Sequence, residues 1–186
     1  RSEAKELDLK VHLDGARFFN AVEDLKCNPK DLAGCADSVS ICFSKGLGAP
    51  AGSILCFPKD MEQKVRRQRK ILGGALRQAG VLGAACKYAL ENNIARLKED
   101  HERAQYLAKA LRPFHKTGNG TELQSQTNMV FFEPLENSNK DLVSFLKERK
   151  IIISKPEPKT RLVMHLDISD EFLNIFIKAI EEFYST

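Results

Sequence analysis

The sequence predicts an α/β fold followed by a smaller α+β region. From residue 10 to about 57, short apolar segments end in glycine and alternate with a helix-like connection, the pattern of a parallel sheet. From 60 to about 112 the apolar spacing becomes helical. A stretch rich in turn residues at 111–121 then leads into a mixed region. We therefore expect one domain at 1–112 and a second at 113–186.

The first domain should hold three strands within "KVHLDGA", "DSVSICFSKG" and "AGSILCF". The helix-like stretch at 17–34 separates the first two, so we expect these two strands to be parallel. Only "GLGAPA" joins the second and third. That connection is too short for a helical crossover, so this pair should be antiparallel if adjacent.

The helical region that follows carries apolar residues at the spacing of one helix face: Val81, Leu82, Ala85, Tyr88, Ala89, Ile94 and Leu97. In the second domain we expect strands at 127–133, 151–154 and 161–167. Helices should occupy 138–150, capped by Ser138, and 169–184, capped by Ser169. The last helix has one apolar face, made of Phe172, Phe176, Ile180 and Phe183.

Composition excludes some classes of protein. Hydrophobic residues make up 42% and charged residues 29% of the 186, as in ordinary soluble domains. No apolar run approaches the roughly 20 residues that span a bilayer, so we expect no membrane partner. The formal charge of +4 is too small to indicate nucleic acid. The basic run at 59–70 is read mainly as a solvated helix face.

The five cysteines form no C-x-x-C pair: Cys27, Cys35, Cys42, Cys56 and Cys86. Their odd number favours free thiols and a reducing compartment, the cytoplasm. The first residue is Arg1, and "RSEAKELDLK" resembles the tail of a helix that runs into a strand. A targeting segment would lie upstream, so a mitochondrial location stays open.

A lysine stands at the end of an apolar strand, in "ICFSKGLGAP". One interpretation is that Lys45 only ends the strand and reaches into solvent. The other depends on the glycines after it, which let the backbone approach a bound group closely. A desolvated lysine amine at such a place is a Schiff-base nucleophile.

A carboxylate ends the preceding strand, in "VHLDGAR". Asp14 could cap the next helix, or it could point into the crevice at the carboxyl edge of an open α/β sheet. A lysine for an aldehyde and a carboxylate for a pyridinium nitrogen are the pair that pyridoxal phosphate requires. Asp14 and Lys45 are therefore candidates for a pyridoxal-phosphate site.

Four segments carry a resemblance: "HLDGARFFNA", "CFSKGLGAPAGSIL", "RKILGGALRQAGVL" and "RLVMHLDIS". In this order they resemble the low-specificity L-threonine aldolases, and the likeness runs from about residue 10 to 180. This family implies a fold-type I pyridoxal-phosphate enzyme. The first domain would then be part of its three-layer α/β/α large domain, followed by the small C-terminal domain.

The resemblance also implies roles for individual residues. Lys45 matches the catalytic lysine that binds pyridoxal 5′-phosphate, and Asp14 matches the aspartate on the ring nitrogen. Arg17 is similar to an arginine that holds cofactor or substrate carboxylate, and Arg161 to the arginine that clamps the substrate carboxylate. Arg77 resembles an arginine that approaches a cofactor phosphate across a dimer interface, and Lys70 is a second candidate for the same phosphate.

One loop departs from the family pattern. Ala75 and Leu76 stand where the family's loop usually has a third glycine and a methionine, but Arg77 is in place. The implied activity is retro-aldol cleavage of L-threonine or L-allo-threonine to glycine and acetaldehyde, with the substrate held as a Schiff base on the cofactor. Homodimers or homotetramers are usual in the family.

Family members are longer, and their phosphate cradle and ring-stacking histidine lie in the N-terminal half. We therefore expect this chain to be one half of an aldolase, with weak or no activity alone. The alternatives are a truncated, non-catalytic protein that acts through residual dimerisation surfaces, and another β-eliminating lyase of the same fold. We expect no metal site: His12 and His165 are read as structural, and His101 and His115 as surface residues.

Overall fold

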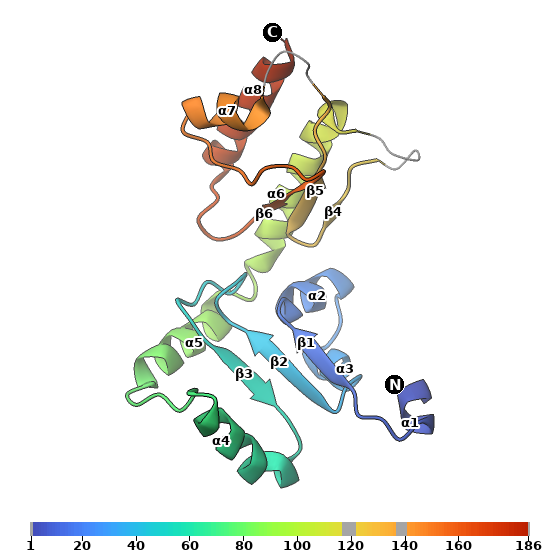
Figure 1. Cartoon of the computed structure of the whole chain (residues 1–186), viewed down its shortest axis with the longest axis vertical. Helices are drawn as coiled ribbons and strands as arrows, with labels where there is room; N and C mark the ends of the chain where they lie inside the picture. The colour runs from blue at the N-terminus through green and yellow to red at the C-terminus, as the bar shows by residue number, and fades with distance from the viewer. Residues whose placement is uncertain (1, 117–121, 137–140, 186) are drawn as a thin grey trace. The chain divides into compact units, whose positions relative to one another are not determined.

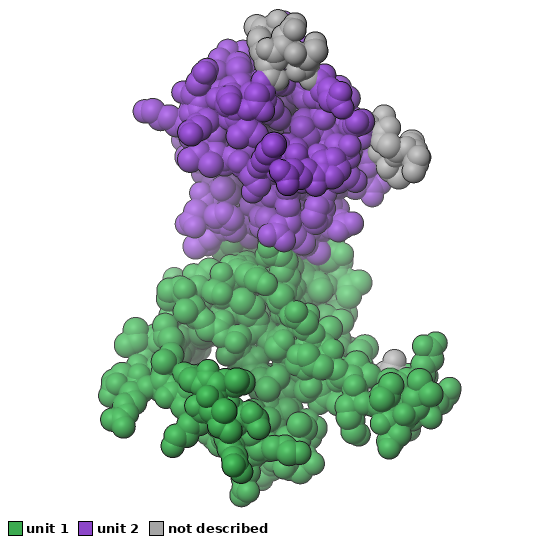
Figure 2. All heavy atoms as spheres, viewed as in Figure 1, with its two compact units in different colours: residues 1–97 green, residues 98–186 purple. Residues whose placement is uncertain are grey.

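The computed structural model describes residues 2–116, 122–136 and 141–185. The chain forms two compact units, Arg1–Leu97 and Lys98–Thr186, coloured separately in Figure 2. This division falls earlier than the domain boundary expected at 112/113. The reason is helix α6 (Leu97–Leu111), whose buried Leu107 and Leu111 belong to the core of the second unit. The domain boundary itself stays a prediction.

The first unit is built on a three-stranded sheet of β1 (His12–Gly15), β2 (Ser38–Cys42) and β3 (Ser53–Cys56). β1 pairs with β2 in parallel and β2 with β3 antiparallel, as the connection lengths predict. Figure 1 shows the arrows of β1 and β2 pointing the same way. The carboxyl ends of β1 and β2 therefore meet at one edge of the sheet.

The expected helix at 17–34 is two helices, α2 (Phe18–Leu25) and α3 (Pro29–Ala33). Lys26 ends α2 in the left-handed conformation with φ of 50°. Asn28 then caps α3 by accepting a hydrogen bond from the N–H of Lys30, ahead of a proline at the first helical position. Asn28 and the proline explain the break, because both favour the start of a helix over its interior.

The remaining elements of the first unit are helical, and a short helix precedes β1. They are α1 (Ser2–Glu6), the 3₁₀ turn η1 (Lys59–Met61), α4 (Glu62–Ile71) and α5 (Gly80–Asn92). None of the described residues of α4 is buried. The predicted apolar face is only partly correct, because Ala89 and Leu97 are buried whereas Val81 and Tyr88 are exposed.

The second unit is a small α+β fold. Its sheet has the order β4 (Ser125–Gln126), β5 (Met129–Phe132), β6 (Thr160–Val163), with both pairs antiparallel. Helices α6, α7 (Leu142–Glu148) and α8 (Asp170–Ser185) accompany it, with the 3₁₀ turn η2 (Arg112–Phe114) after α6. The buried side chains of these elements form one continuous apolar cluster.

The helix caps of this unit follow the sequence in part. Ser169 caps α8: its hydroxyl accepts a hydrogen bond from the N–H of Phe172 at 3.1 Å. The predicted cap Ser138 lies outside the described residues, and Asp141 caps α7 by accepting from the N–H of Ser144 at 2.9 Å. Hydrogen bonds from Ser144, led by its side chain, lower the pKa of Asp141.

Two predictions for this unit are wrong. The β-branched run at 151–154 is no strand; Ile151 continues from α7 by donating to the carbonyl of Leu146 at 2.9 Å, and Ile151 and Ile153 pack against the core from outside the sheet. Phe172 is 58% exposed, although Phe176, Ile180 and Phe183 are buried as expected. In both cases the apolar pattern of the sequence did not reveal what the residues pack against.

Candidate functional site

Lys45 lies three residues beyond the end of β2, in an exposed bend. The loop around it is closed by backbone hydrogen bonds. The N–H of Ala49 donates to the carbonyl of Phe43 at 2.9 Å, and the N–H of Gly48 donates to the carbonyl of Lys45 at 2.9 Å. Gly48 has φ of 70°, a conformation in which glycine is favoured. The glycine-rich sequence therefore makes a tight, closed loop that presents the lysine side chain to solvent.

Asp14 lies on the neighbouring parallel strand, directly opposite Ser40 in the register of β1 and β2. Its Oδ1 accepts a hydrogen bond from the N–H of Ala16 at 3.0 Å, and its side chain is exposed. Asp14 is not the cap of the next helix. The N-cap position of α2 is Arg17, whose side chain makes no capping hydrogen bond. The structure thus brings Asp14 and Lys45 to the same carboxyl edge of the sheet.

Gly15 follows Asp14 because no side chain fits there. A Cβ at this position would lie 2.5 Å from the carbonyl oxygen of Ser40. The strands are thus close at the point where the candidate carboxylate leaves the sheet. Any larger residue would push β1 away from β2 and displace Asp14.

The other candidates of the first unit lie at different places. Arg17 is half-buried, two residues after β1. Lys70 is in the last turn of α4 and Arg77 in the turn before α5, both exposed. Among the residues that the structure describes, no hydrogen bond or ion pair joins Lys70 or Arg77 to Asp14 or Lys45. The structure assigns these two to the unit but not to a shared site.

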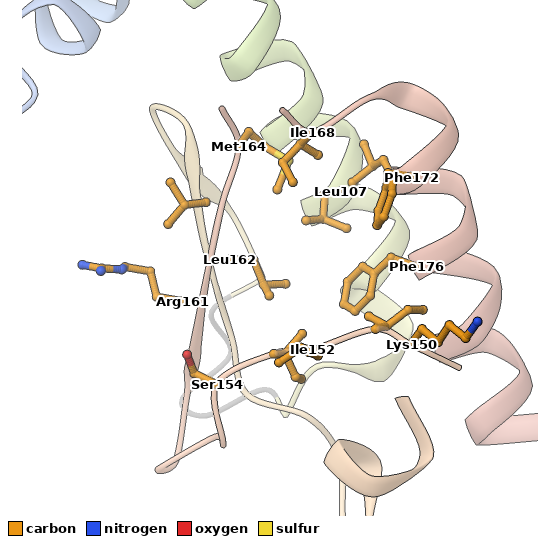
Figure 3. Close-up of a pocket in the computed structure, with 14 residues that line it drawn as sticks. Leu107, Lys150, Ile152, Ser154, Arg161, Leu162, Met164, Ile168, Phe172 and Phe176 are labelled. Carbon is orange, nitrogen blue, oxygen red and sulfur yellow. The ribbon is translucent and has the colours of Figure 1, made fainter. Parts of the chain in front are cut away.

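Arg161 is on β6 of the second unit, opposite Phe131 of β5. An apolar cavity of about 290 Å³ borders this strand. In Figure 3, Leu162, Leu107 and Phe176 point into the cavity, whereas Arg161 projects away from it. The alternation of side chains along a strand explains this difference. Arg161 is exposed and available to an anionic group on the opposite side of the sheet.

The histidines only partly follow expectation. His12 is in β1 as predicted, with Nδ1 2.8 Å from the hydroxyl of Ser38, but it is exposed. His101, expected at the surface, is 7% exposed and therefore buried. His115 is half-buried, and its Nδ1 accepts from the N–H of Glu133 at 3.1 Å. His165 is half-buried beside Asp167.

Two findings concern metals and membranes. Within residues 2–116, 122–136 and 141–185, no three His, Cys, Asp or Glu side chains come together in a way that could hold a metal ion. Over the same ranges, every helix is too short or too polar to cross a bilayer. All five cysteines are free thiols.

Comparison with known proteins settles the family. The model of the beta-eliminating lyase family matches residues 1–134. This chain belongs to the beta-eliminating lyase family. Its sequence relatives include the low specificity L-threonine aldolase of Escherichia coli K12, 43% identical over 91% of this chain and 49% of that protein. The low-specificity L-threonine aldolase 1 of Arabidopsis thaliana is 35% identical, over 96% of this chain and 51% of that protein.

Solved structures establish the fold of this beta-eliminating lyase family member. The threonine aldolase of Leishmania major matches with a TM-score of 0.72 and 19% identity, over 98% of this chain and 54% of that one. The serine palmitoyltransferase of Sphingomonas wittichii matches with a TM-score of 0.63 and 16% identity, over 97% and 48%. The fold is that of the fold-type I pyridoxal-phosphate enzymes, as expected. The chain spans about half the length of the relatives that it matches.

The buried residues of the loop that carries Lys45 were not predicted from the sequence. Phe43, Leu47 and Ala49 are buried in a cluster with Ala89 of α5 and with Leu97. These residues gave no signal in the sequence beyond being apolar, because loop residues between two strands are usually exposed. The cluster shows that the loop is part of the core of the first unit.

Proposed function

We propose that this chain supplies the lysine, the ring-binding carboxylate and the anion-binding arginines of a pyridoxal-phosphate-dependent L-threonine aldolase. The observation that carries the proposal is the placement of Asp14 and Lys45 at the carboxyl ends of adjacent parallel strands. Ligands of open α/β sheets bind at this edge. The names of the sequence relatives support the same activity.

The residues present fit pyridoxal phosphate by their chemistry. Lys45 has a solvent-accessible amine for the aldehyde, and Asp14 has an exposed carboxylate for the ring nitrogen. Arg77 and Lys70 are exposed cations suited to a phosphate. When bound, pyridoxal phosphate supplies a carbonyl for the amine and a ring that accepts the electron pair of the breaking Cα–Cβ bond.

Each side chain then has a defined task. The Nζ of Lys45 would hold the cofactor through its carbonyl carbon, the atom that the amine of the substrate would also use. Asp14 would hold the cofactor by accepting a hydrogen bond from its ring nitrogen, which favours the protonated ring. Arg161 holds the substrate carboxylate through two N–H donors, and Arg17 supports the same group or the cofactor. Threonine or allo-threonine would give glycine and acetaldehyde.

We also propose that the protein acts as a homodimer or homotetramer, with Arg77 reaching the site of a second copy. The support is the exposed apolar residues that precede this arginine: Ile71, Leu72 and Leu76 are 64%, 82% and 64% exposed. Apolar patches of this kind mark interaction surfaces. Light scattering coupled to gel filtration measures the mass; a monomer at all concentrations would contradict this part.

The test of the proposed function uses the chain alone and a version extended at its N-terminus to the length of its relatives. Each is mixed with pyridoxal phosphate, reduced with borohydride and digested, and the modified lysine is found by mass spectrometry. In the extended version we expect the adduct on Lys45 and glycine release from L-threonine, both abolished by Lys45→Ala. The control Lys59→Ala, on η1, should keep both.

The outcomes separate the alternatives. An adduct and glycine release only in the extended version would mean that the phosphate cradle lies outside this chain. Activity in the chain alone would show that the 186 residues suffice. No Lys45 adduct in either version would overturn the proposed function, and the oligomeric state would then remain as the property to explain.

A further inference from the structure

The turn that carries Lys45 is held at the end of helix α5 by a side-chain hydrogen bond. The Nδ2 of Asn93 donates a hydrogen bond to the backbone carbonyl of Leu47 at 2.7 Å, across 46 residues of sequence. Asn93 is the residue that ends α5, and its own N–H donates to the carbonyl of Ala89. Its side chain is thus held on a helix end while its amide reaches the loop.

The loop is built so that a shift at Leu47 moves Lys45. Leu47 lies inside the turn that the Gly48 N–H closes onto the Lys45 carbonyl. At the base of the loop, Phe43 donates to the carbonyl of Gly52 at 3.0 Å and accepts from Ala49. The backbone between Phe43 and Ala49 is therefore a loop closed by hydrogen bonds, with little conformational freedom. The amide of Asn93 binds this loop from a separate element.

The loop between Phe43 and Ala49 also makes buried contacts with the rest of the first unit. Leu47 is 3% exposed and packs in the cluster that contains Ala89 of α5. A Cβ on Gly46 would lie 2.8 Å from Oδ1 of Asn20, a buried residue of α2. The loop backbone is thus in close contact with α2 and joined to α5. Lys45 is thus exposed on a loop in which Gly46 and Leu47, the two residues that follow it, are buried.

We propose that Asn93 is a positioning residue for Lys45: its amide fixes the loop so that the lysine amine meets the cofactor carbonyl. This inference rests on the proposed function of Lys45. The physical reason is that a reacting group must be held to within about 0.5 Å of its productive position. A misplacement of about 1 Å costs on the order of 100-fold in rate.

The chain offers a matched control at the same helix end. Asn92 is the same residue type, one position earlier, and its Nδ2 donates to the carbonyl of Tyr88 at 2.9 Å within its own helix. Asn93→Ala removes the tether to the loop, whereas Asn92→Ala removes a bond of similar length that does not reach the loop. Asn93→Asp keeps the shape of the side chain but replaces the donating amide with an acceptor.

The experiment compares the four proteins in whichever version, the chain alone or the extended one, carries the Lys45 adduct. The first readout is the pyridoxal phosphate concentration that half-saturates borohydride-fixed modification of Lys45. We expect it to rise roughly tenfold in Asn93→Ala and in Asn93→Asp, on the scale of a lost alignment. Asn92→Ala should stay within twofold of the parent protein.

The second readout is amide hydrogen exchange without cofactor. The N–H groups of Gly48 and Ala49 should exchange faster by about tenfold in both Asn93 variants, while the amides of β1 and β2 stay protected. If β1 and β2 also lose protection, Asn93 only supports the fold and the inference is wrong. It is equally wrong if the Asn93 variants match Asn92→Ala in both readouts.

Failure of the two proposals can be told apart. If the parent protein forms no adduct on Lys45, the proposed function falls, and the positioning role falls with it. If the parent forms the adduct and both Asn93 variants form it as readily, only the positioning role is overturned.

Discussion

The two units of this chain differ in how much of their apolar surface they bury themselves. Among the described residues, the main core cluster of the second unit contains sixteen buried residues, whereas the cluster in the first unit contains five. Of the large apolar side chains that are exposed, twelve lie in the first unit and six in the second. Yet the first unit holds Lys45 and Asp14.

The unit with the larger core is therefore not the unit that holds the candidate lysine and carboxylate. The second unit has a continuous core between its sheet and its helices, so its stability comes from its own residues. The first unit places its cofactor-binding candidates at a sheet edge and leaves β3 and α4 exposed. Its apolar surface is the kind that other protein segments cover.

The largest effect is expected in the core of the second unit. Phe132 on β5 is 0% exposed, so Phe132→Ala should cost about 3–5 kcal/mol by loss of burial and creation of a cavity. Phe172→Ala is the control, because this ring is 58% exposed and its loss should stay within about 0.5 kcal/mol. Urea denaturation measures the free energy of unfolding of both variants. Hydrogen exchange of the β5 amides assigns the loss to the second unit. Equal effects would contradict the described core.

The first unit should be most sensitive where its strands approach closely. Gly15→Ala places a Cβ 2.5 Å from the carbonyl of Ser40, so we expect a loss of about 1–3 kcal/mol. Gly83→Ala on α5 meets no atom within 4 Å and should stabilise the helix by about 0.5–1 kcal/mol. Thermal denaturation gives the two signs; a neutral Gly15→Ala would mean that β1 and β2 separate at little cost.

The cap of α8 should contribute less than the core that the helix covers. Ser169→Ala removes the acceptor for the N–H of Phe172 and should cost ~1 kcal/mol. Ser169→Asp restores an acceptor and a favourable charge at the positive end of the helix dipole, so it should recover most of the loss. Circular dichroism during urea denaturation is the measurement. If aspartate fails to restore stability, the hydroxyl is not acting as a cap.

The smallest effect concerns Tyr184, whose ring stacks on Phe114 with centroids 5.0 Å apart. Burial raises the pKa of Tyr184 to about 12. In the unfolded chain the phenol loses its proton earlier, so the free energy of unfolding should fall as pH rises from about 10 to about 12. Ultraviolet titration should show Tyr184 ionising near pH 12. In Tyr184→Phe this part of the pH dependence should be absent.

Local patterns predicted much of the fold correctly. Connection lengths predicted the parallel and antiparallel pairs of the first sheet, and Ser169 was recognised as a cap from its place before Asp170. The strand at 151–154 was wrong because β-branched composition reports a preference for extended backbone and not the presence of a pairing partner. The prediction that His101 lies at the surface was wrong because burial of a polar residue depends on its neighbours in space.

The candidate site divides in the same way. Lys45, Asp14 and Arg161 could be chosen from the sequence because lysine, carboxylate and guanidinium groups have chemistry that residue type alone reveals. The role proposed for Asn93 could not, since an asparagine at a helix end is common for reasons unrelated to a distant loop.

By itself, the sequence determined most of the strands and helices and the residue types that a cofactor could use. These follow from hydrophobic periodicity, turn residues and side-chain chemistry, all of which act over a few positions. Only the tertiary structure decided that Asp14 and Lys45 share one sheet edge, and that Asn93 reaches Leu47 across 46 residues. Such contacts depend on the register of strands and the packing of helices, which short stretches of sequence do not encode.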